Sequence, residues 1–230
     1  MKKNLYPEID AAGSLGNALN QAFEKMGSTL RVSVGEKMSV YYARIEHGPK
    51  FSQVYVAEAE KCFLPDFWRD GVMLGQGKTD HIDLLAECLN FWLSSNGNTR
   101  DLAEKFSFVK PSPKAVAFDE GNEVAYTWNR ILHDPSDNAL KGFVALAIQD
   151  KTLSALFPFT SLNTLCFSRC TGYPYTNDTP TVCPVAIDQY LVQDHNGAII
   201  GTGTASEALK MVLENLPDNI GPAVKGTSEG

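Results

Sequence analysis

The chain has 230 residues, of which 43% are hydrophobic and 20% charged, a balance typical of folded globular proteins. Its 20 basic and 27 acidic residues give a net charge of −7, which argues against nucleic-acid binding, because that function needs a basic surface. No run of about 18 apolar residues is present, and no apolar run follows the lysines at the N-terminus. We therefore expect no membrane association and a cytoplasmic location.

The first half of the chain combines a strong helix with a series of short strand-like runs. The helix is predicted over 14–26, because Ser14 is a good N-cap and apolar residues recur at every third or fourth position. The runs that follow are rich in tyrosine and β-branched residues and are separated by glycines, which predicts a meander of strands. These runs cover residues 30–34, 39–46, 53–58 and 72–74.

Two helices follow the meander. Helix 80–95 has the clearest apolar stripe of the chain, with Thr79 or Asp80 as its cap. A short helix is predicted over 100–106, and residues 110–119 form a connection that contains two prolines.

The second half again places helices before strands, followed by a last helix. The turn His195-Asn196-Gly197 is a hairpin signal, and Thr204 with Glu207 forms a capping box for the last helix. Residues 157–161 are interpreted as a helix end and a turn. The helices are predicted over 122–133, 136–149, 151–157 and 205–216, and the strands over 163–169, 181–186, 189–194 and 198–202.

Helices and strands are segregated along the chain instead of alternating. This order predicts an α+β fold with antiparallel sheets, helices packed on one side of each sheet, and a helix–meander arrangement in each half. We expect an N-terminal part over 1–110, a C-terminal part over 111–217 and a flexible tail over 218–230. A single compact domain is the alternative.

The cysteines are the residues most able to bind a metal. Cys166, Cys170 and Cys183 could provide three zinc ligands, with His195 as a fourth. However, two sulfurs four residues apart in a strand are separated by roughly 13 Å, which is too far for one ion. We therefore predict reduced structural thiols and no metal.

No motif for catalysis or cofactor binding is complete. The run Gly71–Thr79 ends in Gly-Lys-Thr before a helix, but Val72 stands where a phosphate-binding loop needs its first glycine. The four histidines lie in no local catalytic signature, although a triad assembled by the fold remains possible. We predict no cofactor and no catalytic residue, and an enzyme is the less favoured class.

The stretch FPFTSLNTLCFSRCTGYPYTNDTP, residues 157–180, is the most distinctive in the sequence. Tyrosines beside small polar residues favour a binding surface, because they bury area at a low cost in conformational entropy. The alternative is a loop packed on itself. The predicted binding residues of this loop are Arg169, Tyr173, Tyr175, Thr176, Asn177 and Asp178.

A second predicted binding surface is acidic. Asp66 and Asp70 lie around Trp68, and Asp80 and Asp83 follow. Solvated helix caps are the alternative explanation for these carboxylates. Asp66, Trp68 and Asp70 complete the predicted set of binding residues.

Residues 153–184 resemble an uncharacterised bacterial family whose members are often labelled natural-product biosynthesis proteins from gene neighbourhood. The shared motif is Phe-Pro-Phe-Thr-Ser, then Phe-Ser-Arg, then Tyr-Pro-Tyr and an acidic residue near a proline. A weaker match covers most of 65–217. The chain departs from the pattern at Leu162-Asn163, where many relatives have His-Trp.

Two functions remain after this reasoning. The first is an immunity protein that neutralises a cognate bacterial toxin, for example an ADP-ribosyltransferase or a nuclease, by covering its active site; this is a class-level analogy. The alternative is a biosynthetic enzyme or small-molecule-binding protein, with a pocket lined by Ser168, Arg169, Tyr173 and Tyr175.

Overall fold

The computed structural model describes residues 5–32 and 39–229. Of the strand predicted over 30–34, residues 30–32 have no strand structure, and the remainder lies outside the described residues.

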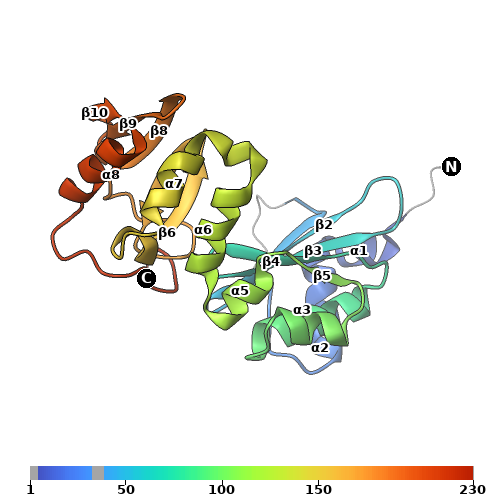
Figure 1. The fold of residues 1–230 in the computed structure, drawn as a ribbon. Coiled ribbons are helices and arrows are strands. Elements are labelled where there is room, and N and C mark those ends of the chain that lie inside the picture. Colours follow the sequence, from blue (N-terminus) through green and yellow to red (C-terminus); the bar gives the residue numbers. More distant parts are fainter. Residues whose placement is uncertain (1–4, 33–38, 230) are drawn as a thin grey trace. The chain divides into compact units, whose positions relative to one another are not determined.

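The chain forms two compact units, Met1–Asp119 and Glu120–Gly230, where the sequence places the boundary after residue 110. Each unit contains helices and one five-stranded antiparallel sheet. The predicted α+β class and the helix–meander arrangement of each half are thus confirmed (Figure 1).

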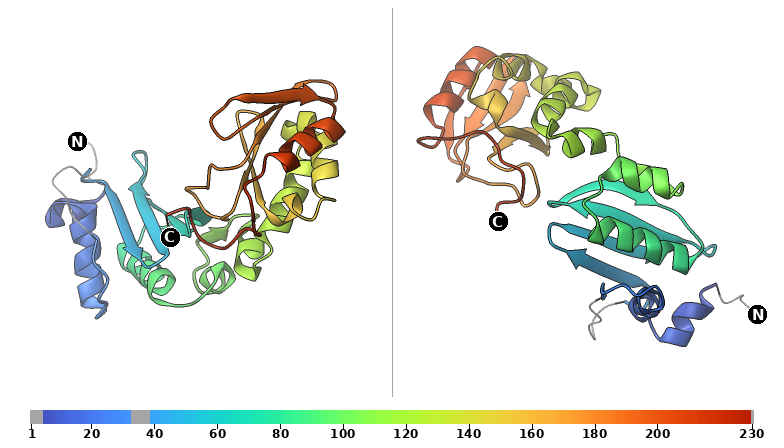
Figure 2. Two further views of the ribbon diagram at one scale, coloured as in Figure 1. Left: turned by 90° about the vertical axis from the view of Figure 1, so that its left-hand side faces the viewer. Right: turned by 90° about the horizontal axis from the view of Figure 1, so that it is seen from below.

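The N-terminal unit has a sheet in the order β1-β2-β3-β4-β5. Helices α2 and α3 pack on each other and on one face of this sheet, which Figures 1 and 2 show from different sides. The elements are α1 (Pro7–Ala12), α2 (Leu15–Lys25), β1 (Tyr42–His47), β2 (Lys50–Val56), β3 (Phe63–Arg69), β4 (Val72–Gly77), α3 (Ile82–Ser94), α4 (Thr99–Lys105), β5 (Val109–Pro111) and α5 (Ala115–Glu120).

Four of these elements, α1, β3, β5 and α5, are absent from the sequence prediction. Strand β3 contains Pro65 and several polar residues, which lower its strand propensity. The turn after it was a usable signal, because Asp70-Gly71 is a typical central pair of a tight hairpin, and both residues have positive φ, 52° and 69°. Strand β5 is short and contains Pro111, which an edge strand tolerates.

Lys50 holds the end of α3 on the sheet. Its side chain is only 9% exposed, and Nζ donates hydrogen bonds to the carbonyl oxygens of Trp92 (3.1 Å), Ser95 (3.0 Å) and Gly97 (2.9 Å). The ammonium group also lies 4.3 Å from the centre of the Trp92 ring. The last carbonyls of a helix have no partner within the helix, so a cation there satisfies them and opposes the negative end of the helix dipole.

The C-terminal unit has a sheet in the order β10-β9-β8-β7-β6. Helices α6 and α8 contact one face of it, and α7 packs against both helices (Figure 2). A single core includes Trp128, Phe143 and Phe167. The elements are α6 (Glu123–His133), the 3-10 helix η1 (Pro135–Leu140), α7 (Lys141–Ala147), the 3-10 helix η2 (Leu153–Ala155), β6 (Phe157–Ser161), β7 (Thr164–Ser168), β8 (Thr181–Ala186), β9 (Gln189–Gln193), β10 (Ile199–Gly203) and α8 (Ala205–Glu214).

Three secondary-structure predictions for this unit are wrong. Of the helix predicted over 151–157, only the three-residue 3-10 helix η2 is present. Residues 157–161, interpreted as a helix end and a turn, form the edge strand β6, which pairs with β7 along its whole length. The turn between them consists of Leu162 and Asn163, whose φ angles are 48° and 66°. Positive φ at both positions is the backbone of a two-residue hairpin. Leucine is not a typical residue of such a turn, so the sequence does not predict it. The single helix over 136–149 is divided into η1 and α7.

The C-terminal tail is also ordered where the sequence predicts flexibility. Residues 223–228 run beside the segment that follows β7, and Cys170 and Val224 form a parallel bridge. Backbone hydrogen bonds join Val224 N–H to Arg169 O (2.9 Å), Thr171 N–H to Val224 O (3.1 Å), Gly172 N–H to Gly226 O (2.7 Å) and Ser228 N–H to Pro174 O (2.8 Å). Pairing with a segment more than fifty residues away stabilises the tail, and the local sequence carries no signal of it.

Replacing Lys50 by methionine tests the helix-end interaction. The variant keeps most of the side-chain volume but leaves three carbonyls without their donor, so we expect a loss of about 2–4 kcal/mol in the free energy of unfolding. The control is Lys25→Met, since Lys25 is exposed and its ion pair within the described residues is with the exposed Asp83; a loss below about 0.5 kcal/mol is expected there. Equal losses in urea denaturation would contradict the role of Lys50.

Candidate functional site

The loop between β7 and β8, residues 169–180, is organised around the buried hydroxyl of Ser168. This hydroxyl accepts the backbone N–H groups of Cys170 (3.0 Å) and Thr176 (3.2 Å) and donates to the carbonyl of Cys170 (2.8 Å). In addition, Thr176 Oγ1 accepts the N–H of Arg169 (2.9 Å). The start of the loop, at residues 168–170, is thereby held to Thr176 on its other side. Ser168 is fully buried, so it does not line an open pocket as the small-molecule hypothesis expects.

The two tyrosines of the loop have different environments. Tyr175 is half-buried, stacks on Phe159 with ring centres 4.3 Å apart, and lies 5.6 Å from Phe157; burial raises the pKa of its hydroxyl. Tyr173 packs edge-on against Tyr175 and remains 66% exposed. Tyr175 is therefore mainly a support, and Tyr173 is the ring that the loop presents to solvent.

Further contacts fix the ends of the loop. Arg169 and Asp178 form an ion pair of 2.7 Å that is half exposed. Thr171 donates to the carboxylate of the buried Glu123 on α6 (3.2 Å). With the tail bonds described above, these contacts give a loop that is packed on itself and still exposes Tyr173 and Asn177. The structure thus brings together all six residues predicted for this loop.

The charge of the chain is concentrated in the same unit. Residues 120–230 contain 12 acidic and 6 basic residues, a net charge of −6, whereas residues 1–119 contain 15 acidic and 14 basic residues, a net charge of −1. The acidic balance of the sequence is therefore a property of the C-terminal unit.

The acidic surface predicted in the first half is not one patch. Asp66 lies on the face of β3 that the helices leave open, and Asp70 lies in the turn after β3. Asp83 belongs to α3 on the covered face, where it pairs with Lys25 at 3.3 Å. The alternating directions of side chains along a strand and the turn geometry separate residues that are close in sequence.

The open face of the N-terminal sheet instead shows a row of polar side chains beside an aromatic pair. Five polar residues follow one another across the five strands, three neighbouring pairs being aligned by the strand register and the pair Gln53 and Asp66 being joined by a hydrogen bond. In this line the N–H of Gln53 donates to Asp66 Oδ1 (2.7 Å), and burial raises the pKa of the Asp66 carboxyl. The five are Arg44, Gln53, Asp66, Gln76 and Lys110.

The aromatic pair beside this row is Phe51 and Trp68, which stack with ring centres 5.1 Å apart. The guanidinium group of Arg44 lies 4.1 Å from the centre of the Phe51 ring. Trp68 is thus near Asp66 on the same face, whereas Asp70 is at the end of the strand.

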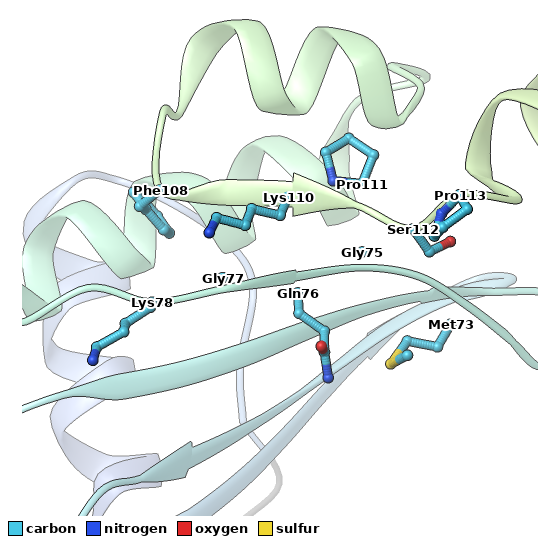
Figure 3. Close-up of a pocket in the computed structure, with 10 residues that line it drawn as sticks. All are labelled: Met73, Gly75, Gln76, Gly77, Lys78, Phe108, Lys110, Pro111, Ser112 and Pro113. Atoms are coloured by element: carbon cyan, nitrogen blue, oxygen red, sulfur yellow. The ribbon is translucent and has the colours of Figure 1, made fainter.

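A hollow of about 410 Å³ lies along β4 and β5, where this row ends (Figure 3). Sequence reasoning missed it, although Gly75 and Gly77 carried a signal, since glycine within a strand indicates a missing side chain or a close approach. The hollow is lined by Met73, Gly75, Gln76, Gly77, Lys78, Phe108, Lys110, Pro111, Ser112 and Pro113.

The described residues offer little for covalent or metal chemistry. Burial raises the pKa of the Cys166 thiol to about 11, which keeps it protonated and unreactive near neutral pH. Within residues 5–32 and 39–229, no three His, Cys, Asp or Glu side chains are placed to hold a metal ion. No helix in the same ranges is long and apolar enough to cross a membrane.

Comparison with known proteins adds one finding. The model of a family of unknown function, DUF6193, matches residues 122–227. No curated protein and no solved structure matches the chain. The DUF6193 match covers almost the whole C-terminal unit, from the start of α6 to the tail that pairs with the loop, so the loop and most of its supports and acidic residues lie within it.

Replacing Ser168 by alanine tests the support of the loop. Because the change leaves buried backbone groups of Cys170 and Thr176 without a partner, we expect a loss of about 1–3 kcal/mol in stability. Hydrogen exchange should accelerate at both amides and stay unchanged in β9, which serves as the internal control. Unchanged protection at Thr176 would contradict this arrangement.

The half-buried carboxyl of Asp66 should make stability depend on pH. Its folded-state pKa is raised by burial, so its stabilising contribution is present at low pH and is lost as the pH rises through that pKa. Asp66→Asn stays neutral and can still accept the Gln53 N–H, so we expect it to be more stable than the parent at neutral pH. This gain should shrink as the pH falls toward the usual aspartate pKa of about 3.9. A pH-independent difference in melting temperature would contradict the expectation.

Proposed function

We propose that this protein is a non-enzymatic binding protein whose C-terminal unit docks on a basic surface of another protein. The observation that carries the proposal is the exposed Tyr173 on a loop held by Ser168, by Tyr175 and by the C-terminal tail. A loop that is already ordered before binding loses little conformational entropy when it binds.

The side chains of the loop support a protein partner. Tyrosine contributes a large, rigid contact area, and small polar residues such as Asn177 adapt their hydrogen bonds to the surface they meet. The ion pair of Arg169 and Asp178 is half exposed, so its groups can exchange partners at the edge of an interface. The charge of −6 on this unit would speed the approach to a cationic partner.

We propose further that the partner is a toxin domain and that the protein acts as its immunity protein. Nucleases and ADP-ribosyltransferases bind phosphate-bearing substrates, and sites of that kind are commonly cationic. An acidic protein that covers such a site would inhibit by steric occlusion and would need no catalytic residue of its own.

The alternative is a small-molecule-binding protein, as the resemblance in residues 153–184 implies. The observation that favours it is the hollow at β4 and β5. That hollow is formed by residues of the N-terminal unit, which are not among the residues that match DUF6193.

The proposal predicts that Tyr173→Ala weakens binding to the toxin encoded beside this gene. A central exposed aromatic residue typically accounts for about 2 kcal/mol or more of binding free energy, so the dissociation constant should rise by about thirtyfold, and protection of cells against the toxin should fall. Tyr55→Ala is the control, because Tyr55 is 45% exposed and belongs to the N-terminal unit.

Salt dependence separates the two parts of this proposal. Raising the ionic strength should slow association of the parent and of Tyr173→Ala alike, because the charge on the C-terminal unit is unchanged. If the purified parent protein neither binds nor protects against the neighbouring gene product, the immunity function is wrong. If it binds and Tyr173→Ala binds equally well, the loop is not the contact surface.

A further inference from the structure

Strand β4 carries glycine at two alternate positions, Gly75 and Gly77, which both border the hollow at β4 and β5. A Cβ atom on Gly77 would lie 3.1 Å from the Phe108 ring and 3.1 Å from Pro65. One on Gly75 would lie 3.3 Å from the carbonyl oxygen of Lys110. These glycines let β5 and its flanking residues approach β4 closely, and the surrounding longer side chains form walls around the space (Figure 3).

The walls combine apolar and polar groups. Phe108, Met73 and the two prolines provide the apolar part, and Lys110, Gln76 and Ser112 provide hydrogen-bonding groups. Figure 3 shows the Lys110 side chain extending along β5 toward Phe108, while Gln76 and Met73 project from β4. A concave site with an apolar lining and a few polar groups is the usual form of a small-molecule site, and its volume lies within the usual range of about 300–1,000 Å³.

The charged side chains that line the hollow indicate which kind of molecule it can bind. Lys78 already forms an ion pair of 2.6 Å with Glu60, so its charge is balanced. Lys110 has no acidic partner among the described residues. The hydroxyl oxygen of Ser112 is buried and has no hydrogen-bond partner in the same part of the chain. The hollow thus offers one unbalanced positive charge.

We propose that this hollow binds a small carboxylate whose apolar body is about the size of a single ring. The carboxylate would pair with the Lys110 ammonium group, the apolar body would lie against Phe108, and Gln76 would donate to the remaining oxygen. A monoanion matches the single unbalanced charge, whereas a dianion would bring a second charge without a partner, which is unfavourable. This site is independent of the loop proposed for protein binding.

Benzoate and its neutral isostere benzamide test the proposal on the full-length protein. With benzoate we expect saturable shifts of backbone amide resonances in residues 73–78 and 108–112 by NMR. Benzamide should bind about tenfold more weakly, because it lacks the charge-assisted hydrogen bond. Equal affinities for the two compounds, shifts elsewhere in the chain, or shifts that do not saturate would each overturn the proposal.

Lysine variants test which ammonium group pairs with the carboxylate of benzoate. Lys110→Met should weaken benzoate binding by about tenfold and leave benzamide binding unchanged, since only the charged contact is lost. Lys78→Met should change benzoate affinity by about twofold or less, because Glu60 already neutralises this lysine. The control for a general loss of positive charge is Lys25→Met on α2, which should change nothing. An unchanged benzoate affinity in Lys110→Met would overturn the assignment.

Discussion

The alternation of side chains along antiparallel strands divides each sheet of this protein into a covered face and an open face, and both proposed binding surfaces depend on that division. In the N-terminal unit, α2 and α3 bury one set of side chains, so the other set, including Asp66 and Trp68, remains beside solvent. In the C-terminal unit, α6 and α8 cover the face that carries Leu165 and Phe167. The residues of β6 on the opposite face, Phe157 and Phe159, then support Tyr175 of the loop.

Buried polar groups hold a helix end and a loop in place on these sheets. Lys50 satisfies three carbonyls where α3 ends, and Ser168 satisfies backbone groups on both sides of the loop. Each is a single side-chain group that several segments share as a hydrogen-bond partner, so its loss would free more than one segment. Because the two units have separate cores, a change in one centre should act mainly within its own unit.

The two proposed binding surfaces differ in shape and in charge, so they suit different kinds of ligand. The loop of the C-terminal unit offers a protruding, pre-ordered tyrosine in a field of negative charge, which suits a large basic surface. The hollow of the N-terminal unit offers a concave, partly apolar space with one positive charge, which suits a small anion. The nearly neutral balance of residues 1–119 is compatible with the second kind of ligand, whereas the charge of −6 on residues 120–230 would repel it.

The sequence by itself determined the α+β class and several local features. Ser14 caps α2 through its side chain, and Thr204 with Glu207 forms the capping box of α8, because these contacts join residues three positions apart. The loop residues could be predicted as one group because they are contiguous. Only the tertiary structure decided that residues 157–161 are a strand, that the tail at 223–228 pairs with the loop, and that Gly75 and Gly77 border a hollow. Each of these depends on pairing or packing with residues across a turn or farther along the chain, which local propensity and periodicity do not encode.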